Sequence, residues 1–94
     1  MKKKAVSVNR KSRHQIVVLQ RGWVVCGDVS RDKNEIVVNN AHVIRVWGTT
    51  RGLGELALEG AKSATRLDPC GVVRAEAGTT VLTIDVKPGV RLGS

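Results

Sequence analysis

The feature that most constrains the fold is a succession of short runs rich in Val and Ile, separated by polar or glycine-containing turns. The first run, QIVVLQ, is followed after Arg21-Gly22 by WVVCGDVS, and a polar RDKN turn then leads into EIVVNN. β-Branched residues favour strands because they pack well on a pleated, half-buried surface. The strands expected from such runs span residues 15–20, 23–30, 35–40, 41–47, 71–75 and 80–86.

One short helix interrupts this series. In GLGELALEG, Leu53, Leu56 and Ala57 recur at i, i+3 and i+4, and Gly60 is a suitable stop, so a helix is expected at about 52–59. Short strands at spacings of about eight to twelve residues are typical of small β barrels and sandwiches. A chain of 94 residues makes one domain. The sequence therefore predicts a single, mainly β domain with one short helix.

The stretch RGWVVCGDVSRDKNEIVVNNAHVIRVW, residues 21–47, makes the fold class more specific. A glycine precedes an apolar triplet, a second glycine lies inside the strand, and a polar hairpin leads to another apolar run that ends in Asn-Ala. This pattern resembles the strongly bent strands of Sm-like and other SH3-like small barrels. Gly27 is expected to supply the bend that a short barrel strand needs. The resemblance implies a fold and carries no function.

A second pattern consists of VVLQRGWVV, NNAHVIRVWGTTRGLGELAL and LDPCGVVR, spread over residues 15 to 75. It resembles a family of small bacteriophage and prophage proteins that share a Trp-Gly-Thr and Gly-Leu-Gly-Glu-Leu-Ala signature with a downstream Leu-Asp-Pro. The resemblance implies a phage context and no particular reaction. Many phage proteins of this size bind nucleic acid or disarm host defence, some of them by sequestering nucleotide signals. An anti-defence role is therefore an expectation by association.

Positive charge is concentrated at the start of the chain. The sequence holds 16 Lys and Arg against 8 Asp and Glu, and six of these cations but no acid lie within residues 1–14. We expect 1–14 to be a flexible basic leader, 15–90 the β domain and 91–94 a tail. Such a leader either binds phosphate backbones without sequence preference or keeps the chain in solution. The nucleic-acid contacts of the first interpretation are Lys2, Lys3, Lys4, Arg10, Lys11 and Arg13.

The glycine-rich stretch WGTTRGLGELALEG is the strongest candidate for a ligand site. A glycine-rich approach to a helix start exposes backbone N–H groups, which is the chemistry of an anion site. Threonine hydroxyls add donors, and an arginine adds a bidentate contact to phosphate. The ligand-binding residues predicted on this basis are Arg45, Thr49, Thr50, Arg51, Gly52 and Gly54.

Two features of the same stretch favour a purely structural role. The Lys-Ser/Thr pair of a nucleotide triphosphatase loop is absent. Glu55 falls in the first helical turn, where it satisfies the helix dipole itself and repels a phosphate. On this alternative the glycines serve the backbone conformation of a strand-to-helix connection, and Leu53 and Leu56 close one end of the barrel.

The sequence offers little support for catalysis or for a metal. His14 lies in the basic leader, His42 and Cys26 lie within strands, and no close pair joins them to Cys70 as a zinc site usually requires. The two cysteines are read as free thiols. We expect no enzyme activity, no cofactor and no bound metal.

Size and composition suggest self-association. With no Phe and no Tyr, the core has to be built from Val, Ile, Leu and Ala, and exposing Trp23 or Trp47 is costly. A small core of this kind gains from burying further surface between subunits, so a homo-oligomer is expected. No apolar run reaches membrane-spanning length and no signal peptide is evident, which predicts a soluble protein of the cytoplasm, the host's if the chain is phage-encoded.

Taken together, these features predict a non-enzymatic, oligomeric, phage-type protein that binds a phosphate-bearing ligand. A nucleotide, held by the glycine-rich loop and by arginines of a neighbouring subunit, is the first expectation. The first alternative is a nucleic-acid-binding protein that uses the basic leader. The second alternative is a structural or interaction protein of the phage that binds no ligand.

Overall fold

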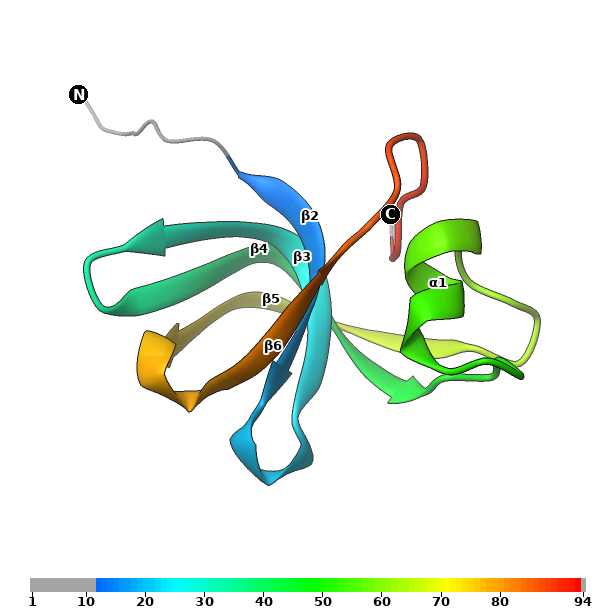
Figure 1. Ribbon diagram of the computed structural model, residues 1–94, viewed down its shortest axis with the longest axis horizontal. Coiled ribbons are helices and arrows are strands. Elements are labelled where there is room, and N and C mark those ends of the chain that lie inside the picture. Colours follow the sequence, from blue (N-terminus) through cyan, green and yellow to red (C-terminus); the bar gives the residue numbers. More distant parts are fainter. Residues whose placement is uncertain (1–11, 94) are drawn as a thin grey trace.

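The computed structural model describes residues 12–93, which form a five-stranded antiparallel sheet with a short helix beside it (Figure 1). The predicted leader contacts Lys2, Lys3, Lys4, Arg10 and Lys11 lie outside the described residues. The strands are β2 (Arg13–Leu19), β3 (Val24–Asp32), β4 (Glu35–Val46), β5 (Arg66–Glu76) and β6 (Thr80–Asp85). The helix α1 spans Leu53–Glu59, and the 3₁₀ segments η1 (Gln20–Gly22) and η2 (Ala77–Thr79) join β2 to β3 and β5 to β6.

The sheet has the strand order β5-β4-β3-β2-β6. The strands from β2 to β5 form a meander, and β6 returns to pair with β2, so that Gln15 lies opposite Asp85 and Ile16 opposite Ile84. Within the described residues β5 and β6 are the two outer strands, and the barrel is not closed. The prediction of a mainly β fold with one short helix is confirmed.

The inner strands read as continuous apolar runs because they bury side chains on both faces of the sheet. On one face Ile16 and Cys26 pack with Leu56 of α1, and all three are completely buried. On the other face Val17 and Val25 pack in a second cluster. A strand covered on one side only alternates between apolar and polar residues, whereas burial on both sides removes that alternation.

Strand β4 is longer than expected, because the two predicted runs at 35–40 and 41–47 form one element. The chain passes through Asn40 with a φ of +52°, and the register with β5 shifts between Val38 and Ala41. The register with β3 shifts at Gly27, where an added Cβ would lie 2.7 Å from the carbonyl oxygen of Asn39. The irregularity expected at Gly27 is thus present, and it lets two long strands bend together.

The ends of the folded region and the tryptophans differ from expectation. Strand β2 begins at Arg13, before the expected start, and Leu92 in the expected tail is 1% exposed. Trp23 and Trp47 are 58% and 43% exposed, because aliphatic side chains fill both core clusters. Within residues 12–93 no helix is long and apolar enough to cross a membrane.

Candidate functional site

The glycine-rich loop is the crossing from β4 to α1, and its path is set by a close backbone approach. Gly48 has a φ of +68°, and a Cβ there would lie 2.4 Å from the backbone of Ala64 and Thr65. The Thr65 hydroxyl donates a hydrogen bond of 2.7 Å to the carbonyl oxygen of Trp47. Only glycine allows this approach, so Gly48 determines how the loop leaves the sheet.

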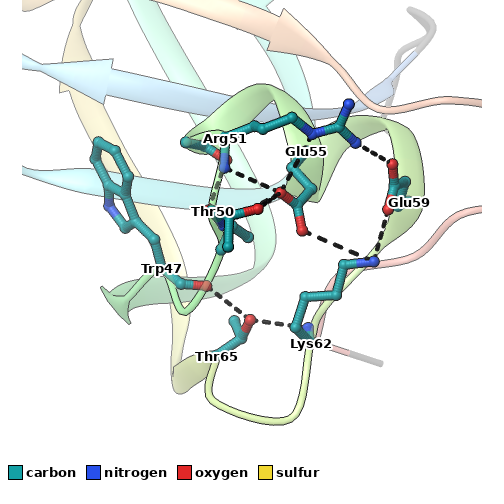
Figure 2. Close-up of polar contacts among 9 residues, drawn as sticks. Trp47, Thr50, Arg51, Glu55, Glu59, Lys62 and Thr65 are labelled. Carbon is teal, nitrogen blue, oxygen red and sulfur yellow. Dashed lines mark hydrogen bonds and ion pairs between the residues drawn. The ribbon is translucent and has the colours of Figure 1, made fainter.

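Hydrogen-bond donors of the loop point toward the side chain of Glu55, as Figure 2 shows. One carboxylate oxygen, Oε1, accepts the backbone N–H of Arg51 at 3.0 Å, the N–H of Thr50 at 3.2 Å and the Thr50 hydroxyl at 3.3 Å. Glu55 is only 9% exposed. The loop thus forms an anion-binding cradle, and the carboxylate of Glu55 occupies it.

Charged side chains extend this cluster along α1 (Figure 2). The Arg51 guanidinium pairs with Glu59, and its Nε lies 3.6 Å from Glu55. Lys62 Nζ lies 2.7 Å from Glu59 and 3.9 Å from Glu55. The hydrogen bond from Lys62 holds the pKa of Glu59 below its usual value. The two cations nearest the cradle are therefore already compensated by carboxylates.

The structure brings some of the predicted ligand residues together and leaves others apart. Thr50 and Arg51 contact Glu55, and the Thr49 hydroxyl donates to the carbonyl oxygen of Gly52 at 2.8 Å. Gly54 lies in the first turn of α1 with open space where a Cβ would be. Arg45 is bound to Asp68 of β5 at 2.7 Å instead. Ligand binding by these residues stays a prediction.

The two histidines hold the C-terminal segment in place. The backbone N–H of Leu92 donates to Nε2 of His14 at 2.9 Å, and Nδ1 of the same ring donates to Asp28 at 3.1 Å. The ring of His42 donates to the carbonyl oxygen of Asn40 and lies against Gly93. Both rings have structural partners, and Leu92 is fixed inside the core.

Asp28 is the centre of this second polar cluster. Besides His14, it accepts hydrogen bonds from Arg91 at 3.0 and 3.4 Å and from Asn40 at 3.5 Å. Burial raises the pKa of Asp28, but the hydrogen bonds from Arg91, His14 and Asn40 outweigh it and hold the pKa below the usual value. Sequence reasoning missed this cluster because Asp28 is 14 residues from His14 and 63 from Arg91.

Neither cysteine is bridged. Cys26 is fully buried, and burial raises the pKa of its thiol to about 11, whereas Cys70 is exposed on β5. Among residues 12–93 there is no group of three or more His, Cys, Asp or Glu side chains that could hold a metal ion.

Comparison of the chain with protein-family models, with curated proteins and with solved structures found no match in any of the three.

Proposed function

We propose that this chain is a non-enzymatic protein that binds nucleic acid through contacts to phosphate. The observation that carries the proposal is the distribution of charge: six cations and no acid lie within residues 1–14, directly before and at the start of β2. Each Lys or Arg that neutralises a phosphate releases condensed counterions, which favours binding whatever the base sequence. A run of cations at one end of a small domain suits such contacts.

The occupied donors of the loop at Gly48–Gly52 favour nucleic acid, bound elsewhere, over a nucleotide bound in this loop. Its donors already meet a carboxylate that accepts three hydrogen bonds, and Arg51 and Lys62 are paired with Glu59. A phosphate bound there has to displace Glu55 and leave it without these partners. Hydrogen bonds to a charged group contribute about 1.5 to 3 kcal/mol each, so the displacement is costly.

His14 and the buried thiol of Cys26 favour a protein without catalytic chemistry. A general base needs a free ring nitrogen within reach of a substrate, but both nitrogens of His14 have protein partners. Cys26 is fully buried with a raised pKa and therefore remains a thiol, which is a poor nucleophile.

A nucleotide held by the loop is the second candidate, because the loop has the donors of an anion cradle. It requires Glu55 to leave the cradle, and arginines of a neighbouring subunit to compensate. Arg51→Ala separates the two candidates. Arg51 is 69% exposed, so its loss changes the free energy of unfolding by no more than about 1 kcal/mol. A nucleotide in the loop would lose about tenfold to hundredfold in affinity, whereas nucleic-acid binding at the leader would not change.

The phage context and the homo-oligomer belong to the same proposal. They rest on the sequence resemblance and on the small aliphatic core, respectively. A chain that binds neither DNA, RNA nor a mononucleotide would instead be a structural or interaction protein of the phage.

Salt dependence tests the proposed function. We expect labelled single-stranded DNA, followed by fluorescence anisotropy, to lose affinity on the order of a hundredfold between about 50 and about 200 mM salt. A variant lacking residues 1–11 should keep the cooperative melting transition and show a flatter salt dependence. If full-length protein binds neither DNA nor RNA at about 50 mM salt, the proposal is wrong.

A further inference from the structure

An open hollow of about 420 Å³ lies where β2 begins and where the chain turns back after β6. Figure 1 shows both segments at the same end of the sheet, and the N–H of Val86 donates to the carbonyl oxygen of His14 at 3.1 Å. Arg13, Lys87 and Arg91 line the hollow, with Asp85 as the one carboxylate among the lining residues. The volume is within the range of about 300 to 1,000 Å³ that is usual for small-molecule sites.

The ends of β2 and β6 bring like charges together in this hollow. The β2–β6 ladder ends where Gln15 lies opposite Asp85, and Arg13 and Lys87, just beyond that end, both line the hollow. Like charges at the same site repel each other, and an anion bound between them offsets the repulsion. Neither Arg13 nor Lys87 has an ion pair with any of residues 12–93, and Asp85 is bound to the Gln15 side chain at 2.6 Å.

The third cation of the hollow is held in position. Asp28 binds the Arg91 guanidinium through two oxygens, and the next residue, Leu92, is fixed by its bond to His14 and by its burial in the core. A side chain that is ordered before binding loses less conformational entropy when a ligand arrives. The hollow thus combines two cations that have no ion pair among residues 12–93 with one oriented guanidinium, beside the Asp85 carboxylate.

We propose that this hollow binds a phosphate group of a nucleic-acid strand that also contacts the basic leader. The inference rests on the proposed function and names the part of the folded domain that performs it. Lys2, Lys3, Lys4, Arg10 and Lys11 precede Arg13 directly in the chain, so the hollow continues the same series of cations. Phosphate oxygens accept hydrogen bonds from guanidinium and ammonium groups alike, and a phosphate between Arg13 and Lys87 removes their repulsion.

The test compares two double variants that lose the same charge. Arg13→Gln with Lys87→Gln removes two cations of the hollow. Arg21→Gln with Lys33→Gln is the matched control, because these two exposed cations lie in η1 and in the β3–β4 turn and also lack ion pairs with the described residues. We expect the first variant to bind labelled single-stranded DNA about tenfold or more weakly, with a log–log salt slope lower by about two. The control should lose much less affinity.

Amide NMR shifts of the unaltered protein give a second measurement that does not depend on how the variants fold. Addition of the same DNA should shift the amides of Lys87, Gly89 and Val90. Equal losses of affinity in the two variants, without shifts at these amides, would show that the hollow is not a phosphate site while DNA binding by the protein stands. If the full-length protein binds no DNA, the proposed function and this inference fail together. If AMP shifts these amides at the same concentration as the strand does, the site binds nucleotides and the strand is not its ligand.

Discussion

At the scale of single residues, Glu55 occupies the place that an anionic ligand would take. Its carboxylate accepts hydrogen bonds from the backbone N–H groups of Thr50 and Arg51, which lie in the loop before α1. Hydrogen bonds to a charged group contribute about 1.5 to 3 kcal/mol each, so the loop conformation depends strongly on this one side chain. The glycine-rich sequence and the acidic residue that follows it are parts of one structural unit.

Glu55→Ala is therefore expected to lower the free energy of unfolding by about 1 to 3 kcal/mol, because it removes a charged acceptor of three hydrogen bonds from the loop. Acetate or phosphate added at high concentration should restore part of the loss by entering the vacated cradle. Urea unfolding with and without each anion measures both effects, with Glu59→Ala, a more exposed carboxylate of the same helix, as the control. A loss below about 0.5 kcal/mol, equal to that of the control, would show that Glu55 does not hold the loop.

Asp28 makes stability depend on pH in a definite direction. Its pKa in the folded protein is lower than the ordinary value of 3.8, so folding favours the ionised form. Its contribution is complete above the ordinary pKa and is lost as the pH falls through the folded pKa, that is, below about pH 4. We expect Asp28→Asn to be less stable than the unaltered protein at pH 7 and the difference to shrink toward pH 2. Unfolding curves that stay a constant distance apart over this range would contradict the assignment.

At the scale of elements, the bend shared by β3 and β4 depends on the close approach at Gly27. The missing side chain leaves room for the carbonyl oxygen of Asn39 and for Val38, each within 2.7 Å of where a Cβ would lie. Through this bend β4 reaches from the β3–β4 hairpin to the loop before α1, as Figure 1 shows. The position of the loop thus depends on a glycine in the middle of a strand.

Gly27→Ala is expected to lower the free energy of unfolding by about 1 to 3 kcal/mol, because two neighbours have to move. Gly78→Ala in η2 is the matched control, since an added Cβ there meets nothing within 4 Å and its φ is not positive. That change should be neutral or stabilise the protein by up to about 1 kcal/mol. Thermal or urea unfolding of both variants provides the comparison, and equal stabilities would remove the argument for a glycine-dependent bend.

At the scale of the whole molecule, the sheet that residues 12–93 form ends in two outer strands. Within those residues β5 and β6 each have one neighbour, and the exposed apolar side chains Val72, Val81 and Leu82 lie on them. Trp23 and Val73 contribute to an apolar hollow of about 300 Å³. Open edges with apolar side chains favour pairing with another chain.

We therefore expect sedimentation at micromolar concentration to show a dimer or a larger assembly. Val81→Lys places a charge on the β6 edge and should shift the protein toward monomer. Leu58→Lys on α1 is the control, because Leu58 is equally exposed, at 60%, but does not lie on a strand edge. A monomeric unaltered protein, or the same shift in both variants, would contradict assembly through the sheet edges.

The sequence by itself determined the fold class and most of the elements, although it divided β4 in two and placed the start of β5 five residues too late. β-Branched runs placed strands within a few residues of the observed β2, β3 and β6, and the spacing of Leu53, Leu56 and Ala57 placed α1, because strand and helix preferences act between near neighbours in the chain. Gly27 was recognisable for the same reason, since a glycine inside an apolar run signals a bulge.

Only the tertiary structure decided which charges meet. Glu55 was expected to oppose a ligand through the helix dipole, but its capture by the loop depends on how Gly48 crosses Ala64 and Thr65. Arg13 and Lys87 are 74 residues apart and line the same hollow because β6 returns to pair with β2. Interactions of this range depend on the strand order, which no local pattern of residues contains, and so the hollow could not be found before the sheet was known.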